Sequence, residues 1–174
     1  MKTEQLKKLI ACCSALLGIV AFAMMFMVAV TTSGDNPVTY KGYELAFGKE
    51  LTNVSILGQT SKAKIVFSFG TTLAYVLPLC SAVLFILCAL GKNKGVKFLL
   101  GLIAFGLYVA AIILLVNVRK MSIVEGTTSG WISGQSKNDF TGFDMGIGLI
   151  LGIVFSALGA CTAGTYTCLN LLKK

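Results

Sequence analysis

Four long apolar runs constrain this chain more than any other feature of its sequence. The first, Leu9 to Val30, contains 22 uncharged residues. A helix of that length rises about 30 Å, the thickness of the hydrocarbon core of a bilayer. Only 13% of the residues are charged and 56% are hydrophobic, whereas a soluble domain has about 25% charged residues. The sequence therefore predicts an all-α, polytopic membrane protein, a four-transmembrane-helix bundle with helices at residues 9–30, 65–90, 98–118 and 143–172.

The connections between these runs are too short for a separate soluble domain, so we expect one membrane domain over residues 1–174. Residues 31–64 and 119–142 form two longer loops, and residues 91–97 form a tight basic turn. Segments rich in strand formers in the first loop fit either a small hairpin or irregular turns at the membrane surface. We therefore expect a small irregular or β-containing outer loop beside the helices.

The distribution of basic residues predicts the orientation of the chain. Lysines are more than threefold denser in the two tails and the tight turn than in the two longer loops; they are Lys2, Lys7, Lys8, Lys92, Lys94, Lys97, Lys173 and Lys174. The positive-inside rule places these segments, and hence both termini, in the cytoplasm of a cell-membrane protein. The net charge of +8 flanks apolar spans and forms no basic stripe with interleaved aromatics. We therefore expect the lipid bilayer, and no nucleic acid, as a partner.

The residues that usually carry catalysis or metal binding are missing from this sequence or badly placed for it. The chain has no histidine, the commonest general base and metal ligand. The middle of each predicted span has no ionisable residue, although proton relays and coupled carriers place such groups there. The six cysteines all lie in apolar runs, where packing is their ordinary role. We therefore predict no enzyme, no catalytic or metal-binding residues, no cofactor and no disulfide.

Two nine-residue segments share one order of residue types: aromatic, any, Gly, aromatic, acid, apolar, any, apolar, Gly. They are Tyr40–Gly48 and Phe140–Gly148. Both lie on the predicted outer side, so residues 1–90 and 91–174 would form two duplicated helical hairpins of the same orientation. The alternative is convergence on interfacial chemistry, and a ligand site with the two acids in equivalent places is a further hypothesis. The candidate outer-face motif comprises Tyr40, Gly42, Tyr43, Glu44, Phe140, Gly142, Phe143 and Asp144.

The second segment resembles an aromatic-Thr-Gly-aromatic pattern that follows a membrane helix in small multi-span proteins of Gram-positive-type bacteria. That resemblance covers only the nine-residue segments and the four-span layout, and it implies no activity. The layout, with its longer first outer loop, also resembles claudins. The first loop has neither Trp nor Cys, so the claudin loop signature is missing and no claudin function is carried over.

Small residues recur every four positions in two of the spans, a pattern typical of close helix packing in membranes. The stripe in the fourth span predicts a helix-contact surface, either within one bundle or toward another copy or partner. Its members are Gly148, Gly152, Ser156, Ala160 and Gly164.

Together these features favour a non-enzymatic accessory, assembly or interaction protein of a bacterial cell membrane. Its expected partners are the bilayer and either further copies, as a homo-oligomer, or another membrane protein. The alternative is a transporter or channel subunit built from two parallel helical hairpins.

Overall fold

The computed structural model describes residues 3–33, 37–56, 59–91, 93–129 and 133–171. Within these residues, four helices are long and apolar enough to cross a membrane. They are α1 (Thr3–Ala23), α3 (Phe69–Leu90), α4 (Lys94–Met121) and α5 (Ile147–Leu171). The prediction of a polytopic four-helix membrane bundle is therefore supported by the number, length and composition of the helices.

The predicted C-terminal ends of the second and fourth spans agree with the helices to within one residue, whereas the other predicted ends differ by three to seven residues. Helix α1 begins at Thr3, continues as the short 3-10 helix η1 (Met24–Phe26), and is followed by strand β1 (Val28–Thr31). Helix α5 begins at Ile147, after strand β7 (Asp144–Met145). The strand that follows the first span is largely apolar, and its residues Ala29 and Val30 are completely inaccessible. Hydropathy alone does not separate a short buried strand from the end of a helix.

The second span was predicted to begin too early, because it also follows an apolar strand residue. The third span was predicted too short at both ends. Ile65 belongs to a strand, and α3 begins only after Ser68, whose hydroxyl accepts a hydrogen bond from the Thr71 N–H and caps the helix. Helix α4 is longer than residues 98–118, because Asn93 caps its start and the helix runs through Arg119 to Met121.

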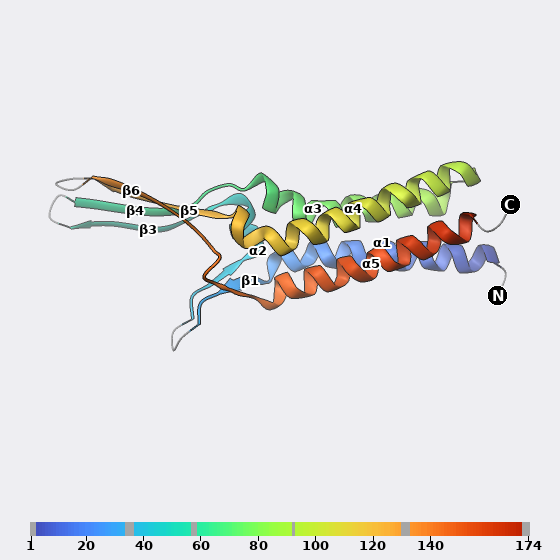
Figure 1. Ribbon diagram of the computed structural model, residues 1–174, viewed down its shortest axis with the longest axis horizontal. Helices are drawn as coiled ribbons and strands as arrows, with labels where there is room; N and C mark the ends of the chain where they lie inside the picture. The colour runs from blue at the N-terminus through green and yellow to red at the C-terminus, as the bar shows by residue number, and fades with distance from the viewer. Residues whose placement is uncertain (1–2, 34–36, 57–58, 92, 130–132, 172–174) are drawn as a thin grey trace.

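The helices form a ring in which each packs against two neighbours that run antiparallel to it: α1 with α3, α3 with α4, α4 with α5, and α5 with α1. Both termini and the α3–α4 turn lie at one end of the bundle, which we call the terminal end (Figure 1). All strands lie at the opposite end, which we call the sheet end. The two long loops therefore lie at the end of the bundle opposite the termini.

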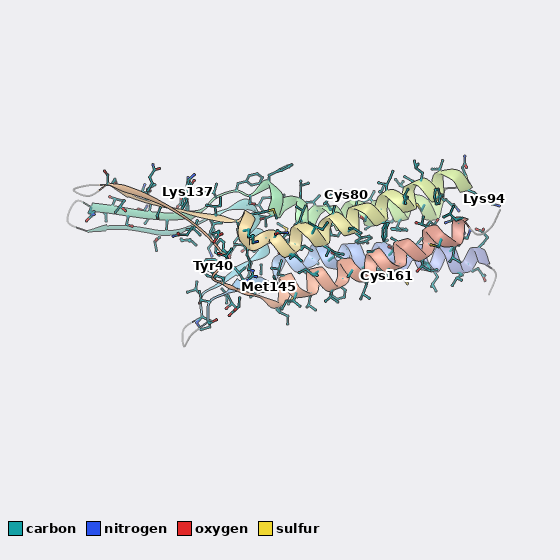
Figure 2. All side chains as sticks on the ribbon, in the orientation of Figure 1. Tyr40, Cys80, Lys94, Lys137, Met145 and Cys161 are labelled. Atoms are coloured by element: carbon teal, nitrogen blue, oxygen red, sulfur yellow. The ribbon has the colours of Figure 1, made fainter. Side chains whose placement is uncertain are left out.

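On α1, small residues face the inside of the bundle and large apolar residues face outward. On α1, Ala11, Ser14 and Ala15 are buried, whereas Leu16 and Ile19 are exposed. Figure 2 shows side chains projecting from the outer surface of the helices along their length. This arrangement suits lipid as the surrounding solvent, because close backbone approach and not apolar burial associates helices there.

The small-residue stripe of α5 packs inside this chain. Gly148 lies against Met27 and the Met24 carbonyl, and Gly152 faces Leu115 and Met24. Ser156 and Ala160 are buried as well, and Gly164 is half-buried beside Phe105. The stripe is thus a contact surface between helices of one bundle.

Tyr108 of α4 crosses the middle of the bundle. Its hydroxyl donates a 2.6 Å hydrogen bond to the Ser14 carbonyl of α1. Gly18 of α1 and Gly159 of α5 leave the space that the ring and hydroxyl occupy. Tyr108, Tyr166 and Phe85 belong to one buried cluster, so the interior between the helices is filled by aromatic side chains.

Two antiparallel sheets and one short helix occupy the sheet end. In the smaller sheet, of order β2-β1-β7, strand β1 is central, between β2 (Thr39–Lys41) and β7. Helix α2 (Gly42–Phe47) follows β2 directly. The larger sheet has the order β3-β4-β5-β6. Its strands are β3 (Lys49–Ile56), β4 (Gln59–Ile65), β5 (Ile123–Ser129) and β6 (Gly134–Asp139).

These sheets correct the prediction of an all-α chain with a small β-containing outer loop. Both loops contribute strands, and β4 of the first loop pairs with β5 of the second. The strands are rooted in the bundle, because β4 leads toward α3 and β5 follows α4. Figure 1 shows the larger sheet extending beyond the helices along the long axis of the molecule. The two central strands of the sheet therefore continue from two helices of the bundle.

Candidate functional site

Three of the four aromatic residues of the predicted motif segments meet beside β1, whereas the ring of the fourth, Tyr43, lies 6.1 Å from that of Phe26. The ring centroid of Tyr40 lies 5.5 Å from that of Phe140 and 6.0 Å from that of Phe143. The Phe140 and Phe143 rings lie 5.0 Å apart in an edge-to-face arrangement. Phe140 is completely buried. The sequence thus identified residues that come together, and their arrangement is that of a packed aromatic core.

The second motif is also tied to the end of α4. The Phe140 N–H donates to the Arg119 carbonyl at 2.9 Å, and the Arg119 guanidinium donates to the Phe143 carbonyl at 2.7 Å. Arg119 is therefore a structural residue that holds the second loop, which explains a basic residue on the side where the lysine density is low.

The glycines of the two motifs have different surroundings. A Cβ on Gly42 would lie 2.7 Å from the Tyr75 hydroxyl and 2.8 Å from the Met25 carbonyl, so only glycine fits there. Gly142 has no atom within 4 Å of the corresponding position in the described structure. The two glycines therefore do not perform one task at equivalent places.

The two acids also have different environments, which contradicts the hypothesis of a ligand site with both in equivalent places. Glu44 is buried on α2, accepts a 2.9 Å hydrogen bond from the Lys41 N–H and pairs with Lys49 Nζ at 2.6 Å. Burial raises the pKa of Glu44, but the hydrogen bonds from Lys49 and Lys41 outweigh it and lower the pKa. Asp144 is exposed on β7, where it accepts a hydrogen bond from the Ser33 hydroxyl.

The prediction of two duplicated hairpins also conflicts with the order of elements. In the first half, the motif precedes the β3–β4 hairpin, and in the second half it follows the β5–β6 hairpin. A parallel duplication would keep one order in both halves. Residues 42–47 form a helix, whereas residues 144–145 form a strand. The shared residue order is better explained by convergence on similar packing tasks.

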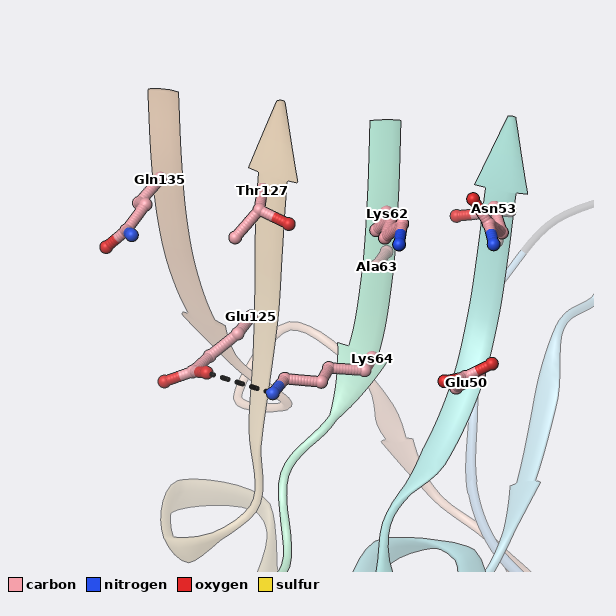
Figure 3. A pocket seen from close by; sticks show the side chains of 9 residues that line it. Glu50, Asn53, Lys62, Ala63, Lys64, Glu125, Thr127 and Gln135 are labelled. Carbon is pink, nitrogen blue, oxygen red and sulfur yellow. Dashed lines mark ion pairs between the residues drawn. The ribbon is translucent and has the colours of Figure 1, made fainter. Parts of the chain in front are cut away.

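The larger sheet carries a row of alternating charges that sequence reasoning missed. Glu50, Lys64, Glu125 and Lys137 are aligned across β3, β4, β5 and β6. Glu125 pairs with Lys137 at 2.8 Å and with Lys64 at 4.0 Å. Figure 3 shows the Lys64 side chain extended across the strands toward Glu125. Opposite charges side by side stabilise neighbouring strands, so the row fixes the register of the sheet.

A second row, of three uncharged polar residues and one lysine, lies farther from the bundle on the same face. It consists of Asn53, Lys62, Thr127 and Gln135, again one residue from each strand. The second row and the first row without Lys137 line a hollow of about 440 Å³ over the sheet, and Figure 3 shows the lining side chains on neighbouring strands. The surface offers lysine ammonium groups, two carboxylates, amides and a hydroxyl, so it can form many hydrogen bonds with a polar partner.

Hydrogen bonds lower the pKa of two acids of this sheet region. The hydrogen bond from Lys137 is the largest influence on Glu125 and holds the pKa of its carboxyl below the usual value. At the end of β6, Asp139 accepts hydrogen bonds from the Thr141 hydroxyl and N–H, which lower its pKa. Both acids are therefore engaged in holding local structure and stay charged at neutral pH.

Comparison with protein-family models, with curated proteins and with solved structures gives no match for this chain.

Proposed function

We propose that this protein is a non-enzymatic interaction protein of the cell membrane, acting through the larger sheet, with both termini in the cytoplasm. One observation carries the proposal: a polar four-stranded sheet extends from the bundle, with every residue of β6 exposed. Among the sheet side chains that the structure describes, those that pack on the hydrophobic core lie at its base, where Ile65 is buried and Val124 and Leu51 contact the core. A sheet with so little apolar packing is well suited to contact another protein.

The rooting of the sheet supports a binding role. Its two central strands connect to α3 and α4, and these helices pack against one another along the bundle. The Ser122 hydroxyl, beside the start of β5, lies 2.9 Å from the Thr71 hydroxyl of α3. These contacts connect the sheet to the bundle, and a binding surface that is already ordered lowers the entropy cost of binding.

The filled interior of the bundle favours an interaction protein over a path within one copy. Tyr75, Tyr108 and Phe85 are completely buried between the helices. The rival hypothesis, a transporter or channel subunit, would therefore need a path between copies. Solute flux through liposomes that contain the purified chain, altered by Gly152→Leu, would favour that rival.

Partner recovery from native membranes tests the proposed function. The tagged chain is cross-linked in the membrane, extracted in mild detergent, and analysed for proteins in stoichiometric amounts, its own copies included. Lys62→Glu reverses a charge in the centre of the sheet face, whereas Lys94→Glu makes the same change at the terminal end. If the partner is a different protein that contacts the sheet face, we expect only Lys62→Glu to reduce its recovery, and equal recovery from both variants would contradict a role of that face. Recovery of no protein, neither a different one nor further copies of this chain, would contradict the proposal.

A further inference from the structure

The larger sheet has two exposed edge strands, β3 and β6. Each pairs on one side, with β4 and β5 respectively, and the part of the chain that the structure describes places no strand on the other side. Unpaired backbone N–H and C=O groups along an edge are a template for another strand. Both edges of the larger sheet are therefore able to pair with a further strand.

A shared membrane restricts how two copies can approach. β3 leads away from the bundle, after α2, and β6 returns to it, because the next residue, Phe140, is bonded to the end of α4. Copies in one bilayer have the same orientation. A β3 edge beside a β6 edge is then antiparallel, like every pair within the sheet, whereas β3 beside β3, or β6 beside β6, is parallel.

The charges select between these arrangements. Since the copies lie at the same depth, each row of the sheet continues into the corresponding row of the next copy. β3 beside β6 places Lys137 of one copy next to Glu50 of the other, so that the alternation of charge continues. Like edges would place Glu50 beside Glu50 or Lys137 beside Lys137, and like charges directly opposite destabilise a strand pair. In the second row, Gln135 would meet Asn53, a pair of amides that can hydrogen-bond.

The spacing of the elements fits the same arrangement. Four strands at about 4.8 Å give a repeat of about 19 Å. The central strands connect to α3 and α4, so the sheet extends across a bundle two helices wide. Two packed helices at 8–10 Å occupy roughly 16–20 Å. Neighbouring bundles can therefore stand side by side while their sheets join.

We propose that copies of this chain associate edge to edge, with β6 of one copy paired to β3 of the next, into a continuous antiparallel sheet over the membrane. The contact is heterologous, so it produces a closed ring or an open row. This inference rests on the proposed function, because it names a second copy as the partner that the sheet binds.

Cysteine cross-linking in membranes tests the pairing directly. The double variant Asn53→Cys/Gln135→Cys is treated with a short bismaleimide, and the wild-type chain, which has six cysteines of its own, is the blank. We expect a ladder of dimers, trimers and larger species from the double variant. The two single variants, expressed together, should stop at dimers, and either one alone should match the blank. A single variant that cross-links with itself, or a double variant that matches the blank, would overturn the proposal.

A charge inversion of the whole row tests the selectivity. The variant Glu50→Lys/Lys64→Glu/Glu125→Lys/Lys137→Glu keeps every opposite-charge neighbour within the sheet and between its own copies. Mixed contacts with the wild type would oppose Glu to Glu or Lys to Lys. We expect each form to co-purify with differently tagged copies of itself and at least tenfold less with the other form. Free mixing of the two forms would refute the role of the row.

The two proposals fail in different ways. If Lys62→Glu reduces recovery of another protein but the edge cysteines do not cross-link, only the edge pairing is wrong. If no protein is recovered and no ladder forms, the interaction function itself is wrong.

Discussion

Replacement of Gly159 by alanine should destabilise the bundle, because the Tyr108 ring lies directly against the α5 backbone at this position. A Cβ on Gly159 would lie 2.5 Å from Cε1 and 2.6 Å from Cζ of Tyr108. Carbon atoms in good contact are about 3.5–4.0 Å apart, so the ring would have to move by about 1 Å. The Tyr108 hydroxyl donates a 2.6 Å hydrogen bond to the Ser14 carbonyl of α1, and Gly18 of the same helix lies against this hydroxyl. Both contacts restrain the movement of the ring.

The expected cost follows from this restraint. Overpacking of a filled interior costs about 1–3 kcal/mol, and the higher helix propensity of alanine offsets up to about 1 kcal/mol of it. Gly106 provides a matched control on α4, because no atom lies within 4 Å of its Cβ position in the described structure. The difference between Gly159→Ala and Gly106→Ala should therefore be about 1–3 kcal/mol. For a chain of this size this corresponds to about 2–12 °C in melting temperature.

Thermal unfolding in one mild detergent, followed by far-UV circular dichroism, measures the difference. Tyr108→Leu removes the ring, so Gly159→Ala should cost little in that background, and the two substitutions should be non-additive. Equal melting temperatures for the two glycine variants would refute the packing argument. So would an undiminished cost of Gly159→Ala in the Tyr108→Leu background.

Four further outcomes are expected. Glu44→Gln should cost about 1 kcal/mol through the lost ion pair with a half-exposed lysine, measured as faster proteolysis at residues 42–47. The pKa of Glu125 in the folded chain is lowered from its ordinary value of 4.5. The stability that its ion pairs contribute is therefore present above pH 4.5, and it is lost as the pH falls through the lowered pKa. The protection factors of the β5 and β6 amides, which compare the observed exchange with the intrinsic rate at each pH, should then fall in acid, and they should depend less on pH in Glu125→Gln. The buried Ser156 hydroxyl has no partner among the described residues, so Ser156→Ala should raise stability by about 1 kcal/mol, measured by thermal unfolding. Single cysteines at Ser136 and Asn93 should react with an impermeant maleimide from opposite sides of the membrane; labelling from one side would contradict the topology.

The four helices could be predicted from the sequence because lipid requires an unbroken apolar segment of a given length. The junctions could not, since Val28 to Val30 are as apolar as the helix before them while forming a strand in the core. The larger sheet was harder still to predict. Residues 60–65 pair with residues 124–129, and two spans separate the partners along the chain. No local pattern fixes such a register.

The charged row illustrates what local reading misses. Glu50, Lys64, Glu125 and Lys137 were ordinary loop charges in the sequence, and only the register aligns them. The alternation of Thr60, Lys62 and Lys64 with smaller residues was the one available sign of a strand. It is weak because both faces of this sheet are largely polar, so no apolar face marks the period of two.

The repeated aromatic–glycine–acid segments have a physical explanation that needs no common function. Each segment fixes one loop to the sheet end of α1, from opposite edges of β1. The Gly42 N–H donates to the Met27 carbonyl at 3.2 Å, and the Gly146 N–H donates to the Ala29 carbonyl at 2.7 Å. Aromatic side chains then cover the junction. A loop that must lie against one backbone and fill one corner requires glycine and aromatic residues in close succession. The similarity therefore marks where the loops are anchored, and the anchored loops in turn hold the four strands whose polar faces and edges remain available for contact.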